Sequence, residues 1–201
     1  MVGRASLNEK VTAGNVEIVA KTFLEQNSRT LGLNVDQLVI QKEHFDKSFG
    51  VVTYQMTYQG IPIFGKYANV VIKIDAVVKF KQDYQKSLSI SVIPGLTSND
   101  AEIAAKEFFG VPEVGVLDSK LIIYQDKLAY QVDLPLIKNW RPSEDKPYIE
   151  PSAFIDPNNG ELIDFIDNIE YDDLSGTVTG MIYPEFATDQ QIEVSFGNEW
   201  V

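Results

Sequence analysis

The chain has 201 residues, of which 44% are apolar and 11% aromatic, enough to bury the core of one large domain or two small ones. Its formal net charge of −12 disfavours binding to nucleic acids and to anionic membrane surfaces. From this charge we expect no nucleic-acid binding. No apolar run is long enough for a transmembrane helix, so we also expect no membrane insertion. The absence of cysteine excludes disulfides, thiol catalysis and thiolate metal sites.

The cellular compartment is not decided by composition. The first six residues contain no apolar region typical of a secretory signal. Both a cytosolic protein and an exported protein whose signal has been removed therefore remain open. A microbial exported protein without disulfides is compatible with the absence of cysteine.

The first half of the chain is predicted to be a helix followed by an antiparallel meander. Asn15 favours a helix start, and an apolar stripe at helical spacing follows it until Gly32. Five segments with the composition of β-strands come next, and Pro94 and Gly95 end the run. We expect these strands at residues 37–41, 51–58, 67–74, 77–84 and 88–93.

The second half repeats this order. Residues 97–100 form a predicted capping box, and apolar residues recur at helical spacing until Gly110 and Pro112. Strands are expected at residues 120–124, 128–136, 152–155 and 161–166. A helix followed by an antiparallel meander, twice over, is typical of an α+β protein in which each helix lies on one face of its sheet.

Residues 58–65, with the sequence Tyr-Gln-Gly-Ile-Pro-Ile-Phe-Gly, are predicted to be the connection of a hairpin. Their apolar side chains stand where a connection is usually polar, which indicates that they pack on another surface. Glycine can adopt positive φ there, and proline stiffens the segment. This octapeptide between two strands resembles the FTP motif in the propeptides of fungalysin- and thermolysin-like zinc metalloproteases. The residues that carry the resemblance are Tyr58, Gly60, Pro62, Phe64 and Gly65.

A second resemblance lies in the other half of the chain. The strand sequence Leu-Ala-Tyr-Gln-Val begins at residue 128, and Phe-Ile-Asp-Pro-Asn-Asn-Gly begins at residue 154. This pair of segments is similar to the PepSY domain that follows FTP in the same propeptides. Its residues are Leu128, Tyr130, Val132, Phe154, Asp156 and Gly160. The aromatic residues of both motifs can be interpreted either as core residues or as contacts to a partner protein, because aromatic side chains stabilise cores and interfaces alike.

The resemblance implies an architecture of two cystatin-like lobes, each a helix packed on an antiparallel β-meander. We therefore expect an FTP-like lobe at residues 1–95 and a PepSY-like lobe at residues 96–173. Residues 174–201 are expected to form a linker and the first strands of a following β domain. So short a terminal segment cannot bury a core of its own, which favours a sequence cut from a longer polypeptide.

Candidates for catalysis or metal binding are few. His44 is the only histidine and is expected in an exposed loop, and neither His-Glu-x-x-His nor Gly-x-Ser-x-Gly occurs. Acidic residues gather between positions 164 and 173, and we interpret them as a solvated strand edge and linker. Calcium is the alternative, although the spacing of a calcium-binding loop is missing. We interpret residues 156–160 as a hairpin turn, and we expect no catalytic residue, no metal site and no cofactor.

The function implied by the resemblance is that of a non-catalytic prodomain. Such a prodomain acts as an intramolecular chaperone and inhibitor of a zinc metallopeptidase catalytic domain, in cis or in trans. The candidate segment for occupying the protease cleft comprises Phe165, Ile166, Ile169, Glu170, Tyr171, Asp172 and Asp173. The alternative is an exported protein-binding or structural module that is not tied to a protease. Either function implies an extracellular or cell-surface location.

Overall fold

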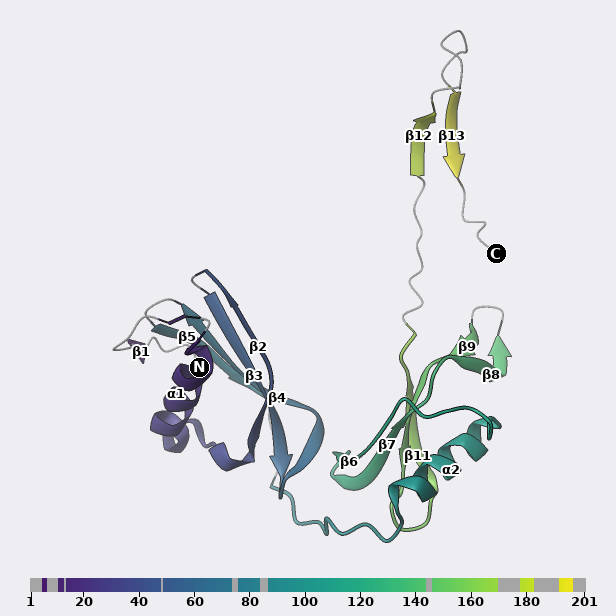
Figure 1. Ribbon diagram of the computed structural model, residues 1–201, viewed down its shortest axis with the longest axis horizontal. Coiled ribbons are helices and arrows are strands. Elements are labelled where there is room, and N and C mark those ends of the chain that lie inside the picture. The colour runs from purple at the N-terminus through teal and green to yellow at the C-terminus, as the bar shows by residue number, and fades with distance from the viewer. Residues whose placement is uncertain are drawn as a thin grey trace. The chain divides into compact units, whose positions relative to one another are not determined.

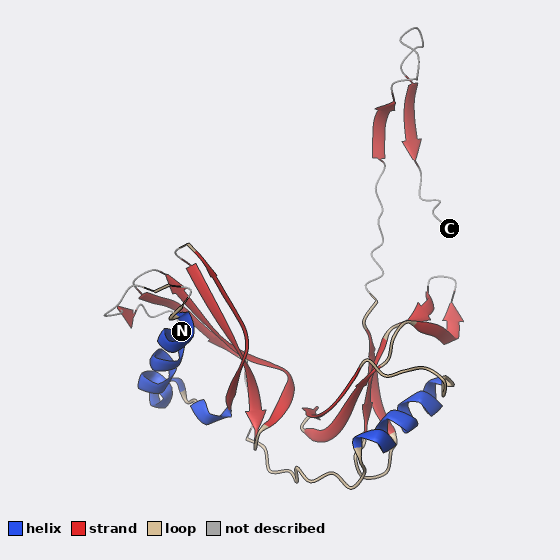
Figure 2. Cartoon of the chain, in the orientation of Figure 1, coloured by secondary structure: helices blue, strands red, loops and turns tan. Residues whose placement is uncertain are grey.

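The computed structural model describes residues 5–6, 11–12, 14–47, 49–73, 76–83, 87–143, 146–169, 178–182 and 192–196. These residues form an α+β protein with two α-helices and thirteen mostly antiparallel strands (Figures 1 and 2). The chain divides into two compact units, Met1–Asn168 and Ile169–Val201. In the second unit, β12 (Val178–Ile182) pairs antiparallel with β13 (Ile192–Phe196).

The N-terminal half of the first unit packs one helix on one face of a sheet (Figure 1). The helix α1 (Val16–Leu31) ends where Gly32 adopts a φ of 65°, as predicted. Val16, Ala20 and Leu24 face the sheet and are buried. The other elements of this half are β1 (Ala5–Ser6), η1 (Val35–Gln37), β2 (Leu38–Asp46), β3 (Phe49–Tyr58), β4 (Ile61–Lys73) and β5 (Ala76–Gln82).

The second half of this unit uses the same arrangement. The helix α2 (Ser98–Phe109) starts at the predicted capping box, in which Thr97 and Asp100 exchange hydrogen bonds, and ends at Gly110 with a φ of 70°. Ala101, Ala105 and Phe109 pack on the sheet. The strands are β6 (Asp118–Tyr124), β7 (Lys127–Asp133), β8 (Ile137–Ser143), β9 (Lys146–Ile149), β10 (Pro151–Ile155) and β11 (Leu162–Asp167).

The sheets of the two halves are continuous at one point. Ile63 of β4 pairs in parallel with Ile123 of β6, which links the strands into one nine-stranded sheet. The buried apolar clusters nevertheless remain separate, since one contains residues 11–80 and another residues 101–155. A third, smaller cluster contains Ile122, Tyr124, Ala129 and Phe154. The fold therefore has one main core in each half, a strand contact between the halves, and this small cluster.

The structure differs from the sequence predictions at three places. Residues 88–93 alternate between exposed and half-buried side chains but form no strand, because alternation describes an extended chain and a strand also needs a pairing partner. The hairpin β8–β9 was not predicted, since Pro142 interrupts its sequence. His44 is exposed, but it lies in β2 opposite Val51 rather than in a loop.

The connection between β3 and β4 also differs from the prediction. It is a turn of two residues, Gln59 and Gly60, instead of an eight-residue connection, because Tyr58 already pairs with Ile61. Both turn residues have positive φ, 50° and 84°, as the common type I′ hairpin turn requires. Residues 61–65 therefore belong to β4.

Candidate functional site

The beginning of β4 bulges out of its own sheet. Gln55 pairs with Tyr67 and Thr57 pairs with Pro62, so residues 63–66 stand opposite Met56 alone. Gly65 has a φ of 66° within this bulge, a conformation that suits glycine because a Cβ makes it costly. The bulge thereby carries Ile63 and Phe64 beyond the edge of the β3–β4 pairing, toward β6.

The side chain of Gln55 fixes the bulge from within. Its Nε2 lies within hydrogen-bonding distance of three backbone carbonyl oxygens, those of Ile63 at 2.7 Å, Lys66 at 3.0 Å and Met56 at 3.0 Å, so its two N–H groups are shared among these acceptors. A bulge removes backbone groups from the regular ladder, and buried groups of this kind need another partner. Gln55 supplies that partner at both ends of the bulge.

An aromatic cluster forms where the bulge meets the second half. The ring of Phe64 lies edge-on to Tyr124 at 5.4 Å and to Phe154 at 5.1 Å between centroids. Tyr124 and Phe154 stack with centroids 3.8 Å apart and an interplanar angle of 7°. Phe154 is fully buried, whereas Phe64 is 38% exposed. We call Phe64, Tyr124 and Phe154 the joint cluster.

Polar contacts orient the tyrosine of the joint cluster. The Tyr124 hydroxyl donates to Oδ2 of Asp164 on β11 at 2.7 Å. Burial, and secondly this hydrogen bond, raise the pKa of Tyr124 above its usual value. Tyr124 is therefore a neutral hydrogen-bond donor at physiological pH, and its ring is held flat against Phe154.

The other residues of the second motif lie outside the joint cluster. Tyr130 and Val132 are buried in the core beneath α2, and the Tyr130 hydroxyl donates to the Leu96 carbonyl at 3.0 Å. Leu128 is half-buried opposite Ile123 at the start of β7. These residues stabilise the second half itself.

The predicted hairpin turn at residues 156–160 is confirmed. Gly160 has a φ of 76° and donates its N–H to the Asp156 carbonyl at 2.9 Å, while the Asp156 carboxylate accepts the N–H of Asn158 at 2.8 Å. The carbonyl of Pro157 accepts from the backbone N–H groups of Gly95 and Leu96 at 3.0 and 2.7 Å. This turn therefore fastens the connection that precedes α2.

The candidate cleft segment divides at the end of β11. Phe165 and Ile166 pair with Ala153 and Ser152 of β10, and the Phe165 ring packs edge-on against Phe109 at 5.5 Å. Ile169 follows the strand and is half-buried. Glu170, Tyr171, Asp172 and Asp173 lie outside the described residues.

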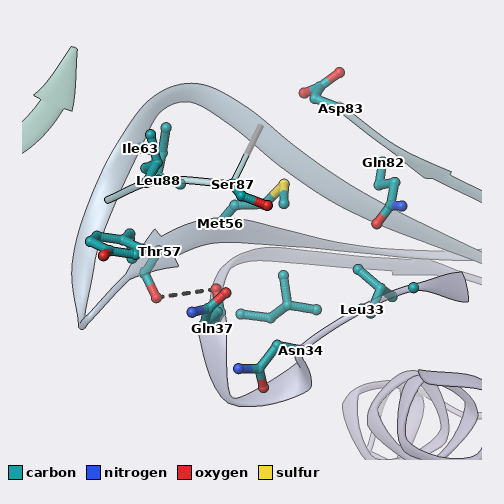
Figure 3. Close-up of a pocket in the computed structure, with 13 residues that line it drawn as sticks. Leu33, Asn34, Gln37, Met56, Thr57, Ile63, Gln82, Asp83, Ser87 and Leu88 are labelled. Atoms are coloured by element: carbon teal, nitrogen blue, oxygen red, sulfur yellow. Dashed lines mark hydrogen bonds between the residues drawn. The ribbon is translucent and has the colours of Figure 1, made fainter. Parts of the chain in front are cut away.

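A cavity of about 480 Å³ lies beside the β3–β4 hairpin (Figure 3). Its walls come from the end of α1 through β2, from the hairpin, and from the end of β5 with the segment that follows. In Figure 3 the Thr57 hydroxyl donates to the Gln37 carbonyl at 3.1 Å across one wall. The lining residues are Gly32, Leu33, Asn34, Gln37, Leu38, Met56, Thr57, Tyr58, Ile63, Gln82, Asp83, Ser87 and Leu88.

The cavity offers hydrogen-bonding groups of neutral residues and apolar surface. Its carboxylate, Asp83, already accepts the backbone N–H of Tyr67 at 2.9 Å, and the Gln82 amide donates to the Leu31 carbonyl at 3.3 Å. Within the described ranges, no three histidine or acidic side chains gather closely enough to hold a metal ion. The lining suits a peptide or another neutral polar ligand better than a phosphate or a metal ion.

Neither α-helix in the described part of the chain has the length and apolar composition that a bilayer span requires.

Sequence reasoning missed Gln55, Tyr124 and Asp164 as members of the site. Gln55 sits in a period-2 strand, where nothing local indicates that its amide reaches into a bulge. Tyr124 did carry a signal, since it precedes the turn residues Gln125 and Asp126 much as Tyr58 precedes Gln59 and Gly60. Aligning the two hairpins in the sequence would have pointed to it.

No protein-family model matches the chain, and no curated protein matches it. Among solved structures, the chain is similar to the Bacillus megaterium YpeB C-terminal domain, with a TM-score of 0.41 and 15% sequence identity. That similarity covers 81% of this chain and 67% of the other.

Proposed function

We propose that the chain is a non-catalytic prodomain of the FTP plus PepSY type, which assists the folding of a thermolysin-like zinc metallopeptidase and inhibits it. The observation that carries the proposal is the joint cluster. Phe64 comes from the first motif and Phe154 from the second, and their rings are 5.1 Å apart. Two motifs recognised separately in the sequence thus form one packed unit.

The proposal assigns the two halves to cystatin-like lobes and the chain to the outside of the cell. A prodomain of this kind stabilises the native peptidase by mass action, since it binds the folded enzyme and not the unfolded chain. The cavity beside the hairpin supports binding of a peptide segment, because its lining combines the amide side chains of Asn34 and Gln37 with apolar side chains such as that of Met56.

Within this proposal, blocking of the protease cleft falls to residues 169–173. Phe165 and Ile166 are committed to the sheet, and removing them would break the β10–β11 ladder. An extended segment that enters a cleft forms backbone hydrogen bonds like those of a substrate strand. Docking by the halves and blocking by residues 169–173 are therefore separable functions.

The experiment measures refolding and inhibition of the thermolysin-like peptidases of the source organism. Each mature peptidase is refolded from denaturant with and without the chain, and residual activity is titrated with the chain. We expect a higher refolding yield and inhibition for one of them. The variant E170A/Y171A/D172A/D173A should still raise the yield but inhibit at least tenfold more weakly.

The matched control is E43A/E107A/E113A, which removes the same number of carboxylates from exposed positions of β2, α2 and the segment after α2. It should behave as the unmodified chain. Equal inhibition by the unmodified chain and the cleft variant would remove the blocking role. No binding to any peptidase of confirmed activity would contradict the prodomain function.

The second candidate function is an exported protein-binding or structural module without a protease partner. The cavity in Figure 3 favours it, since a ligand can bind there independently of any cleft. A module of this kind would bind a peptide with unchanged affinity when residues 170–173 are replaced by alanine, and it would leave peptidase activity unaltered.

A further inference from the structure

The sheet of the N-terminal half has one covered face and one open face. On β3 and β4, Val52, Tyr54 and Val70 point toward α1 and are buried in the first core. The residues between them point away from α1 and are only half-buried, among them Val51 and Thr53. Within the described part of the chain, no helix covers this side of β2–β5 (Figure 2).

The strand register shows how the open face is composed. One row across the four strands contains Lys42, Thr53, Asn69 and Lys81, in which the Thr53 hydroxyl donates to the Asn69 side chain at 2.8 Å. The next row contains His44, Val51, Val71 and Lys79. Each row therefore has an uncharged centre and ends in lysine at β5.

A third row adds both a cation and an apolar side chain. Phe49, which is 41% exposed, stands beside Lys73, and Asp46 lies at the outer end. Asp83, just after β5, is the other carboxylate near this face, and it is bonded to the Tyr67 backbone. Four lysines thus surround an apolar and polar centre with two acidic residues at the corners.

The four lysines are exposed and available. Lys42, Lys73, Lys79 and Lys81 form no ion pair with another described residue. The net charge of the part of the chain that carries these lysines differs in sign from that of the rest. Residues 1–95 contain eleven Lys and Arg and eight Asp and Glu, a net charge of +3. Residues 96–201 hold six against twenty-one, a net of −15.

We propose that the open face of β2–β5 docks an acidic polypeptide surface of a partner protein. Lys42 and Lys81 lie three strand spacings apart, roughly 14 Å, so carboxylates on a partner helix or strand can reach both ends of a row. Apolar partner side chains would cover Phe49, Val51 and Val71. Charge complementarity sets orientation and association rate, while the apolar centre supplies burial.

A protein fits this face better than a phosphate polymer. Phosphate recognition favours arginine, and the four cations here are all lysine. The half-buried valines at the centre offer nothing to a phosphate backbone. The net charge of −12 is largely screened beyond the Debye length of about 8 Å, so the composition of the face itself decides which partner fits. The inference goes beyond the proposed function, because an acidic partner of any class would fit.

The experiment uses the full chain and a fluorescein-labelled peptide of twelve residues, in which four glutamates alternate with phenylalanine, valine and threonine. Binding is measured by fluorescence anisotropy at low and at physiological salt. We expect binding that weakens with salt and weakens at least tenfold for K79E/K81E. The variant K79R/K81R should retain binding within about threefold, since it keeps the charge.

The matched control is K127E/K138E, which makes the same charge change at exposed positions of β7 and β8 and should bind within twofold of the unmodified chain. A peptide with glutamine in place of glutamate should fail to bind. Absence of binding, or equal binding by K79E/K81E and the control, overturns the proposal. Tighter binding of a ten-nucleotide oligouridine, or self-association that K79E/K81E abolishes, overturns its choice of partner. Circular dichroism confirms that each variant is folded.

Discussion

The sheets of the two halves contain similar parts but differ in how many of their faces are covered. In β3, buried and half-buried residues alternate along most of the strand, because α1 covers one face alone. In β10 all five residues are buried. There, α2 covers Ala153 and Ile155, while Phe154 points to the other face and meets the bulge of β4.

The two halves therefore depend on each other to different degrees. In the second half, Tyr124 and Phe154 are contacted by Phe64 of the first half, whereas the first half keeps its own core behind α1 and leaves the other face of its sheet without a described helix. Stability should therefore be concentrated in the second half and at the joint cluster, and binding capacity on the open face of the first.

The largest effect should come from Phe154→Ala. The ring is fully buried and contacts both Phe64 and Tyr124, so its removal should cost about 3–5 kcal/mol of unfolding free energy. The matched control is Val71→Ala on the open face, which should cost about 1 kcal/mol or less. Urea denaturation measures both, and similar costs would mean that the two sheets are covered alike.

Gln55→Ala tests whether the bulge depends on its internal amide. The variant leaves the carbonyls of Ile63 and Lys66 without this donor and should destabilise by about 1–3 kcal/mol. Gln41→Ala, at an exposed position of the neighbouring strand, is the control and should be nearly neutral. A denaturation midpoint for Gln55→Ala equal to that of the control would show that the bulge is held by other contacts.

Thr97→Ala examines the cap of α2. It should cost about 1 kcal/mol, the usual effect of losing an N-cap hydroxyl. The Thr97 hydroxyl, and secondly the Thr97 backbone N–H, donate hydrogen bonds that lower the pKa of Asp100. The contribution of this carboxylate to folding stability is therefore present above its ordinary pKa and is lost as the pH falls through the lowered pKa. NMR titration should find a higher Asp100 pKa in the variant, and an unchanged pKa would contradict this coupling.

The smallest effect is expected for Tyr54→Phe in the first core. The Tyr54 hydroxyl is buried and finds no hydrogen-bond partner among the described residues, so removing it should be neutral or stabilising by up to about 1 kcal/mol at pH 7. Burial, and then the charges of Glu17 and Glu25, raise the pKa of Tyr54 from 10.0 to about 12.

The same tyrosine gives a pH dependence with a definite sign. Between pH 10 and about 12, Tyr54 ionises only in the unfolded chain. This ionisation favours the unfolded state, so the unfolding free energy is unaffected below pH 10 and falls as the pH rises across that window. Denaturation of the unmodified chain and of Tyr54→Phe at pH 9 and pH 11 compares them. Parallel losses in both proteins would assign the alkaline effect to another group.

Much of this fold follows from local sequence signals. Gly32 and Gly110 ended the two helices as predicted, and period-2 alternation identified β3 and β7. The bulge at residues 63–66 was not predicted, because its shape depends on which residues of β3 and β4 pair and on the reach of Gln55. Cross-strand register of this kind is a tertiary property.

In the candidate site, too, local motifs were predicted from the sequence and tertiary contacts were not. Phe64 and Phe154 were identified from their motifs, since glycine, proline and aromatic residues at fixed spacing are visible in one sequence. Their contact with each other and with Tyr124 was not, because it requires two segments ninety residues apart to meet. The open face and its lysines likewise become visible only when the strands are placed side by side.

The most direct test of the joint is a double-mutant cycle between Phe64 and Phe154. Phe64→Leu, Phe154→Leu and the double variant keep apolar volume at both positions, and urea denaturation gives the unfolding free energy of each. We predict a coupling of about 0.5–1.5 kcal/mol, as measured for aromatic pairs in contact. Effects that add within about 0.3 kcal/mol would show that the two motifs do not pack together and would contradict a single joined unit.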